Sequence, residues 1–396
     1  MKKTAMIAAT AVICAVLLAL SSILFGFWSK LEDGAALKVG FVYSGDEITP
    51  ETYNFVLAQK EAERTFGSRI ESIVLSNVNG KEIEEPLRDL ARKGCGIIFI
   101  SVDTDLVKGV AEEYPGVEFC QVSGTEPGTG APKNYHTFNG EIYQARYVSG
   151  VAAGMKLREM IDSGELQPEE AAVGFVGYRE TPEVISAFTA FFLGVRSEAP
   201  EAVMRVRYTG TRSSYSQEKK CARELINEGC VIISQCSATA GPAAACLEAS
   251  GDRTIYHVGN HKNMIEEAPA CSLISVRVNW SPYVTGAVKA VMDHQRIEKA
   301  VKGKVNGNDI RAGLENGWAQ VTALNVEIAA EGTAEKLKKT ADSIRTGKLT
   351  VFKGNYTGTD PDNPEDRIDL NAGFEENRDS SVPSFHFILD GCITVE

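Results

Sequence analysis

The sequence predicts an α/β protein built from two duplicated, Rossmann-like lobes. Its halves repeat one strand–helix order, and short sequence motifs of the first half recur in the second: VGFVY (39–43) resembles VGFVGY (173–178), and KGCGIIFIS (93–101) resembles EGCVIISQC (228–236). Such repetition indicates that one supersecondary unit has been duplicated. The strands are short continuous apolar runs, as expected when helices cover both faces of a parallel sheet. A chain of 396 residues is long enough for two such domains.

The elements follow in order from these apolar runs and from helix start signals. The helix at 182–196, for example, begins with Thr181 as N-cap, Pro182 at its first position and Glu183 in its first turn. The first half predicts strands at 37–45, 71–78, 94–101 and 117–124, and helices at about 50–65 and ending near 93 and 113. The second half predicts strands at 171–178, 203–210, 229–236, 254–260 and 273–278, and helices ending near 196, 227 and 249. The rest predicts a helix after 280, a strand within 317–326, a helix within 334–350, a loop excursion at 353–384 and one closing strand.

Residues 138–154 (FNGEIYQARYVSGVAAG) predict the helix that connects the two lobes. Apolar residues recur three or four apart along this stretch, so they form one stripe of a helix. Gly150 and Gly154 keep one side small, which lets a neighbouring backbone approach closely. We therefore place the first lobe at 37–137 plus roughly 282–330, and the second at 138–281 plus roughly 331–396. No low-complexity linker separates the lobes, so several crossing strands are expected to join them.

The N-terminal segment predicts a membrane helix. Residues 4–29 carry no charged side chain, and about 20 apolar residues suffice to span a bilayer. Lys2 and Lys3 precede the stretch and Trp28 lies at its far end, so the positive-inside rule places the bulk of the chain outside the cytoplasm. Residues 1–36 are expected to form an N-terminal signal or anchor helix and linker, which anchors the protein on the extracytoplasmic face of the cell membrane. Cleavage and lipidation at Cys14 are less favoured, because the apolar run is long and lacks a convincing small-residue cleavage site.

Composition and motifs exclude several classes of function. The net charge of −12 argues against a nucleic-acid partner. No C-x-x-C pair occurs and the chain has only five histidines, so we expect no metal site and no cofactor. No G-x-G-x-x-G follows the first strand, and P-loop and G-x-S-x-G words are absent, so we expect no catalytic residues. Cys95, Cys120 and Cys230 fall in predicted strands and are interpreted as small buried apolar residues; the cysteine spacing names no disulfide pairs, although an extracytoplasmic location permits disulfides.

The carboxyl ends of the strands predict the binding site. In open α/β sheets ligands bind beyond those ends, and two facing lobes form a cleft that hinge closure shuts on a small solute. The strand ends carry hydroxyls, carboxylates, amides, an arginine and aromatic rings, which suit a polar, ring-bearing ligand. Asp46 as a turn residue and Asp105 as a helix cap are the simpler alternatives for those two. The candidate ligand-binding residues from this rule are Asp46, Asp105, Tyr178, Ser237, His261, Asn263, Arg277 and Trp280.

Several of these stretches resemble the basic membrane protein family, the extracytoplasmic solute-binding proteins of ABC importers, several of which bind purine nucleosides. The words YQARYVSGVAAG (143–154) and TPEVISAFTAFFLGVRSEAP (181–200) are the most specific, and VGFVYSG, TYNFVLAQKEAE and VNWSPY add to them. The resemblance spans roughly residues 38–282 and continues more faintly to the end of the chain. It implies a type I periplasmic-binding-protein fold with a ligand cleft between two lobes.

The family's ligand residues match this chain in part. An acidic residue after the third strand is matched by Asp105, and a Thr-Tyr pair that opens the first helix in one branch is matched by Thr52 and Tyr53. The resemblance therefore adds Thr52 and Tyr53 to the candidate ligand-binding residues. The family's Gly-x-Asp-x-Asp after a late strand is here Gly-Asn-His-Lys-Asn at 259–263, and a Trp-Asn-Trp of one branch is Val-Asn-Trp at 278–280.

These observations predict a solute-binding protein that traps a nucleoside-like small molecule between two lobes and delivers it to an ABC permease. A purine nucleoside is the expected ligand, with a Tyr or Trp ring stacked on the base and Asp105 accepting hydrogen bonds. One alternative is a membrane-anchored sensor or regulatory protein of the same fold. Another is a nucleoside-processing enzyme, such as a glycosidase, in which His261 and Asp105 meet at a scissile bond.

Overall fold

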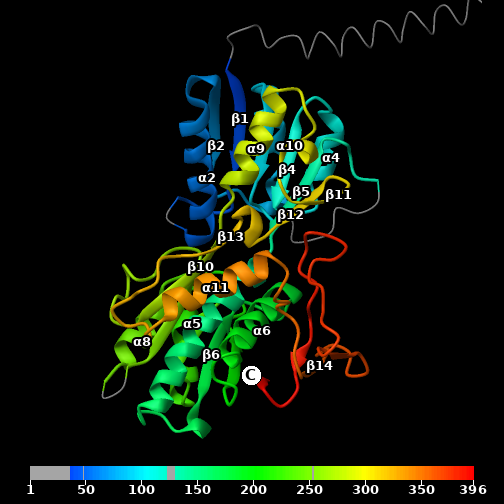
Figure 1. Ribbon diagram of the computed structural model, residues 1–396. Coiled ribbons are helices and arrows are strands. Elements are labelled where there is room, and N and C mark those ends of the chain that lie inside the picture. The colour runs from blue at the N-terminus through cyan, green and yellow to red at the C-terminus, as the bar shows by residue number, and fades with distance from the viewer. Residues whose placement is uncertain (1–35, 48, 123–129, 252–253) are drawn as a thin grey trace, which may run out of the picture.

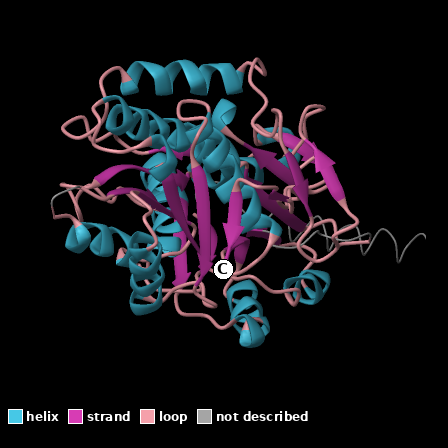
Figure 2. Cartoon of the chain, turned by 90° about the horizontal axis from the view of Figure 1, so that it is seen from below, coloured by secondary structure: helices cyan, strands magenta, loops and turns pink. Residues whose placement is uncertain are grey.

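The computed structural model describes residues 36–47, 49–122, 130–251 and 254–396, and the predicted N-terminal membrane helix lies outside them. Two lobes lie one above the other in Figure 1, each built on a seven-stranded sheet. Figure 2 shows helices on both sides of the strands, as the continuous apolar runs predict. Within the described ranges, none of the helices has the length and apolar character that a membrane crossing requires.

The first lobe contains the sheet β11-β12-β5-β4-β3-β1-β2, in which only β11 is antiparallel to its neighbour. Its strands are buried at their centres except for the edge strands β2 and β11, and Phe41, Phe99 and Phe119 are fully covered. The elements of this lobe are β1 (Leu37–Val42), α2 (Pro50–Phe66), β2 (Ile70–Leu75), α3 (Glu84–Arg92), β3 (Cys95–Ile100), α4 (Val107–Glu113), β4 (Glu118–Val122), β5 (Tyr135–Gly140), α9 (Ser281–Met292), α10 (Ile297–Ala300), β11 (Lys304–Asn306) and β12 (Asp309–Ala312).

The second lobe contains the sheet β13-β10-β9-β8-β6-β7-β17, in which only β13 is antiparallel to its neighbour. The stripe of α6 that carries Phe188, Phe191 and Phe192 is fully buried in its core, as predicted. The elements of this lobe are α5 (Ile142–Asp162), β6 (Ala172–Gly177), α6 (Pro182–Arg196), β7 (Val203–Tyr208), α7 (Tyr215–Asn227), β8 (Ile232–Gln235), α8 (Gly241–Ala249), β9 (Tyr256–Asn260), β10 (Ser272–Val278), β13 (Ala319–Val321), α11 (Thr333–Arg345) and β17 (Ile393–Val395).

The strand orders confirm the predicted duplication. The run β2-β1-β3-β4-β5 of the first sheet has the same order as β7-β6-β8-β9-β10 of the second. Within the described ranges the chain crosses between the sheets three times, after β5, after β10 and after β12. Of the segment predicted at 282–330, β11 and β12 join the first sheet, whereas β13 joins the second. Several crossings hold the lobes together without a linker, as the sequence predicts.

The predicted helix at 138–154 begins later than expected, so this prediction is wrong at its first residues. Residues Tyr135–Gly140 form strand β5 and the helix α5 starts at Ile142. Tertiary packing decides the difference, because Phe138 stacks on Tyr283 with ring centroids 3.7 Å apart and lies edge-on to Trp280. Strand β5 also pairs with β4 and β12, so its backbone groups are satisfied within the first sheet.

The small face of α5 packs directly on α6, as predicted. A Cβ added at Gly150 would lie 2.0 Å from the Phe191 carbonyl oxygen, and one at Gly154 would lie 2.4 Å from that of Val195. A Cβ added at Gly194, the partner glycine of α6, would lie 2.2 Å from the Tyr147 carbonyl oxygen. Because real Cβ atoms do not approach this closely, the close contact of the two backbones requires glycine at 150, 154 and 194.

The C-terminal excursion packs on the second lobe and also reaches the first. It contains a small antiparallel sheet of β14 (Thr357–Thr359), β15 (Arg367–Asp369) and β16 (Ile388–Leu389). Phe385 stacks on Phe352 at 4.4 Å in the second lobe's core, whereas Ser381 donates its backbone N–H to Asp309 Oδ2 of β12 at 2.6 Å. In Figure 1 this red segment runs beside both lobes. The closing strand predicted at the end is divided into β16 and β17, because Gly391, with φ +66, turns the chain between them.

The eight cysteines of the described residues are all free thiols. Cys95 and Cys120 are buried in strands β3 and β4, as predicted, whereas Cys230 is buried two residues before β8 rather than within a strand. Burial raises the pKa of each of these thiols, so they stay protonated and unreactive at neutral pH.

A buried histidine of β5 contacts carboxylates from two neighbouring elements. His136 is 4% exposed, and its ring nitrogens lie 2.6 Å from Glu298 Oε1 and 2.7 Å from Glu118 Oε2. Burial by itself lowers the pKa of His136, but the two carboxylates outweigh it and raise the pKa to about 9. The imidazole is therefore protonated in the folded protein at neutral pH, and donates to both carboxylates.

This arrangement predicts a loss of stability at alkaline pH. The unfolded histidine titrates near 6.5, so between pH 6.5 and 9 the folded state binds the extra proton and the free energy of unfolding falls as pH rises. The full contribution is present below pH 6.5 and is on the order of 3 kcal/mol. We expect His136→Asn to remove this slope in chemical unfolding measured from pH 6 to 9.5. His294→Asn, at an exposed histidine, is the matched control; equal slopes in wild type and His136→Asn contradict the assignment.

Candidate functional site

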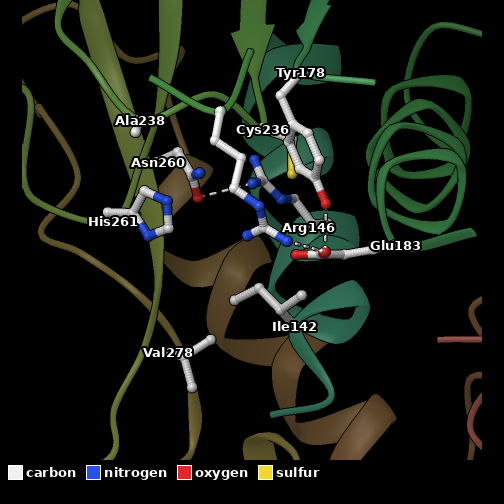
Figure 3. Close-up of a pocket in the computed structure, with 10 residues that line it drawn as sticks. Ile142, Arg146, Tyr178, Glu183, Cys236, Ala238, Asn260, His261 and Val278 are labelled. Carbon is white, nitrogen blue, oxygen red and sulfur yellow. Dashed lines mark hydrogen bonds and ion pairs between the residues drawn. The ribbon is translucent and has the colours of Figure 1, made fainter. Parts of the chain in front are cut away.

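A cavity of about 70 Å³ lies at the carboxyl ends of β6, β8, β9 and β10, where the strand-end rule predicts a ligand (Figure 3). Helix α5 closes one side with Ile142 and Arg146, which lie one turn apart, and the first turn of α6 adds Glu183. All of these residues come from the second lobe. The lining residues are Ile142, Arg146, Tyr178, Glu183, Arg212, Cys236, Ala238, Asn260, His261 and Val278.

Arg146 is the most constrained charged group of the cavity. Its side chain is 1% exposed, and it donates from Nη1 to the Gln235 carbonyl oxygen at 2.7 Å and from Nη2 to Asn260 Oδ1 at 2.8 Å. Its Nε has no hydrogen-bond partner among the described residues. Burial lowers the pKa of this guanidinium, but an arginine keeps its charge at neutral pH. The fold therefore holds a fixed, buried positive charge against neutral oxygens, and spare donors remain.

Tyr178, Glu183 and Arg212 form a second polar group. Tyr178 and Glu183 lie on the opposite side of Figure 3 from His261. Tyr178 donates its hydroxyl to Glu183 Oε2 at 2.6 Å, and burial, then the Glu183 charge, raise the pKa of that hydroxyl. The Arg212 guanidinium lies 4.7 Å from the centre of the Tyr178 ring and 3.9 Å from Glu183 Oε2. A planar cation thus covers one face of the Tyr178 ring.

His261 lies at the contact between the lobes. Its backbone has φ +66, which turns the chain sharply after β9, and its carbonyl oxygen accepts from Asn54 Nδ2 of the first lobe at 3.0 Å. Burial and the Arg146 charge lower the pKa of His261 to about 4, so the ring is neutral at neutral pH and offers one donor and one acceptor. A second interlobe contact joins Arg212 to Asp103, with Nη2 3.8 Å from Oδ2.

The structure brings two of the ten predicted ligand residues, Tyr178 and His261, into the cavity. Ser237 is fully buried beside it and positions Asn260, whose Nδ2 donates to the Ser237 carbonyl oxygen at 3.3 Å. Thr52 is buried at the start of α2, with an Oγ1 that has no partner among the described residues. It lies two residues before Asn54, which contacts the second lobe.

The other six predicted residues lie elsewhere and have other contacts. Asp46 accepts from the Thr49 backbone at 3.0 Å, and Asn263 accepts from the Ile265 backbone at 3.2 Å, so both close local turns. The Arg277 guanidinium binds Gln320 Oε1 across the β10–β13 pair. The remaining three are Tyr53 and Asp105, which are exposed on the first lobe, and Trp280, which is 6% exposed and stacks on Phe55 at 5.2 Å in the first lobe's core.

Arg146, Glu183 and Arg212 are the polar cavity residues that sequence reasoning missed. Arg146 falls inside the helix interpreted as the connection between the lobes, and Glu183 was interpreted as a first-turn helix residue. The signal that finds Arg146 is a charge on the apolar, small-residue side of a buried helix, where an arginine needs partners. Asn260, Cys236, Ala238 and Val278 lie within the strand ends that the rule selected.

Comparison with known proteins identifies the family. Residues 51–348 match the family model of the PnrA-like ABC transporter substrate-binding proteins. The chain belongs to this family. The predicted resemblance to the basic membrane protein family is thereby confirmed, and the two-lobe fold agrees with it.

Two relatives and one solved structure show how far the similarity of this substrate-binding protein extends. A purine-binding protein of Brucella abortus (strain 2308) is 28% identical over 323 residues, which is 80% of this chain and 83% of that protein. A Haloferax volcanii protein, named as a candidate ABC transporter glucose-binding protein, is 25% identical over 280 residues, 71% of this chain and 64% of that protein. A solute-binding protein of an ABC transporter system from Aeropyrum pernix K1 has a similar fold, with a TM-score of 0.63 at 15% identity, covering 79% of this chain and 92% of that one.

The family membership decides the general role. A PnrA-like substrate-binding protein works outside the cytoplasm, binds a small ligand and serves an ABC permease. Family and fold are those of binding proteins rather than enzymes.

Proposed function

We propose that this substrate-binding protein captures a purine in the second-lobe cavity, closes the first lobe over it and passes it to an ABC permease. The observation that carries the proposal is the buried Arg146 guanidinium, which lines a cavity at the predicted sheet edge and has donors to spare. The purine-binding relative from Brucella abortus supports it independently.

The donors of Arg146 favour a particular edge of the purine. Arginine offers only N–H donors, so the ligand atoms beside it must be acceptors. Hypoxanthine and guanine present two adjacent acceptors, O6 and N7, which is the edge that arginine pairs with in guanine recognition. Adenine presents an amino donor in place of O6. Glu183, whose carboxylate accepts hydrogen bonds, suits the ring N–H groups that an oxopurine also carries. We therefore propose an oxopurine, as base or nucleoside.

Lobe movement is part of the proposal. A purine ring that stacks on Tyr178 takes the place of the planar Arg212 guanidinium, which now lies 4.7 Å from that ring. Breaking the Asn54–His261 and Asp103–Arg212 contacts opens the route from solvent to the cavity. The N-terminal segment stays a proposed membrane anchor on the strength of its sequence alone, since it lies outside the described residues.

Ligand screening by thermal unfolding tests the proposal. A ligand that binds only the folded protein adds about 2.7 kcal/mol at a hundred times its Kd, which raises Tm by several degrees. We expect hypoxanthine, guanine or their nucleosides to give this shift, and adenine and glucose to give a smaller one or none. No shift with any purine contradicts the proposed function, whereas an equal shift with adenine contradicts only the choice of an oxopurine.

A further inference from the structure

Three metal-ligating side chains meet in the C-terminal excursion, far along the chain from the cavity. Asp360 follows β14, Asp366 precedes β15 and His386 precedes β16. One ligand atom from each lies within 4.8 Å of the other two. Residues 353–396 lie beyond the part that matches the family model, so nothing in the family assignment accounts for this cluster.

The hydrogen bonding of His386 fixes which nitrogen faces the carboxylates. Nδ1 lies 2.7 Å from the Ser384 carbonyl oxygen. A carbonyl oxygen only accepts, so Nδ1 carries the proton and donates it. In the neutral ring this leaves the Nε2 lone pair directed to the side of Asp360 and Asp366. A metal-bound histidine commonly donates its other ring N–H to a backbone carbonyl in this way, which sets the tautomer and the ring orientation.

The spacing of the three groups fits an ion between them better than direct contact. His386 Nε2 lies 3.8 Å from Asp360 Oδ2 and 3.7 Å from Asp366 Oδ2, which is too long for a hydrogen bond. Zn–N and Zn–O bonds of about 2.0–2.1 Å place two tetrahedral ligands about 3.3 Å apart, so small side-chain movements suffice. Asp360 is pre-positioned, because its Oδ1 accepts from the Asp362 backbone at 2.9 Å.

The cation that follows Asp366 in sequence is engaged with another carboxylate. Arg367, next to Asp366 in sequence, forms its ion pair with Asp390 at 2.7 Å. The Asp390 carboxylate also accepts from Thr357 and Thr359, so this neighbouring pair is complete without Asp360 or Asp366. The two carboxylates that face His386 therefore keep negative charge available for a cation.

We propose that Asp360, Asp366 and His386 bind a divalent transition-metal ion such as zinc. One imidazole nitrogen with two carboxylates suits zinc and its neighbours in the first row, whereas calcium and magnesium prefer all-oxygen sites. The ion joins the β14–β15 turn to the segment before β16. The spacing of cysteines and histidines along the chain predicted no metal site, whereas these three ligands come from two separate stretches.

Zinc binding to the full chain tests the site. We expect isothermal titration with ZnCl₂ to give one zinc per chain, and His386→Asn and Asp366→Asn each to weaken it at least tenfold. His294→Asn and Asp362→Asn are the matched controls, one at an exposed histidine and one in the same turn, and both keep wild-type affinity. Circular dichroism checks that all four variants fold. No zinc uptake by wild type, wild-type affinity in His386→Asn, or equal competition by calcium overturns the proposal. Purine binding plays no part in this experiment.

Discussion

The Arg146→Met substitution is expected to weaken hypoxanthine binding about a hundredfold in isothermal titration calorimetry. Hydrogen bonds from a charged donor contribute about 1.5–3 kcal/mol, and a hundredfold loss corresponds to about 2.7 kcal/mol. Methionine keeps much of the aliphatic length, so the cavity loses donors and charge more than volume. The lost donors matter because the residue is 1% exposed, so the ligand acceptors beside it are buried and lose their hydrogen-bond partner.

Arg158→Met is the matched control on the same helix. Arg158 pairs with Glu201 at 2.6 Å and does not line the cavity, so its loss leaves hypoxanthine affinity within about twofold. The Arg146 variant also frees the Gln235 carbonyl and the Asn260 amide, so its Tm is measured alongside to establish that it is folded. An Arg146→Met protein that is folded and binds hypoxanthine as tightly as wild type contradicts the role given to this residue.

The Gly150→Ala substitution is expected to lower the free energy of unfolding by about 3 kcal/mol or more. The added Cβ would lie 2.0 Å from the Phe191 carbonyl oxygen and 3.1 Å from the Gly194 Cα, and both are backbone atoms. Overpacking a core costs about 1–3 kcal/mol when side chains can adjust, and here two helices must separate. Urea unfolding measures the change.

Gly109→Ala makes the same chemical change at an exposed position and is expected to raise the free energy of unfolding. Gly109 lies on the exposed side of α4, and a Cβ there meets no atom within 4 Å. Alanine is favoured over glycine in a helix by about 0.8–1.0 kcal/mol, so this variant is stabilised. If the two variants change stability by the same amount, close packing of α5 on α6 is not what requires glycine at 150.

Most of the fold could be predicted from local patterns. The paired motifs at 39–43 and 173–178 become β1 and β6, which hold the same place in the strand order that the two sheets share. Continuous apolar runs specify strands buried on both faces, and Gly150 and Gly154 specify a close helix contact. These features depend on residues near one another in the chain. Phe138 was assigned wrongly because its partners, Tyr283 and Trp280, lie more than a hundred residues away.

The residues of the candidate site were likewise predicted only in part from local patterns. Strand order locates the sheet edge, and Tyr178 and His261 follow from that rule alone. Trp280 and Arg277 satisfy the same rule, yet Trp280 stacks on Phe55 and Arg277 binds Gln320, so neither reaches the cavity.

By itself the sequence determined the duplicated α/β architecture, the family and the sheet edge at which the cavity lies, because each depends on periodicity and on short contiguous motifs. Only the tertiary structure decided that a helical arginine, Arg146, is the buried charge of the cavity, and that Asp360, Asp366 and His386 come together. The physical reason is that side-chain direction and long-range packing select which polar groups converge, and neither is encoded in the spacing of residues along the chain.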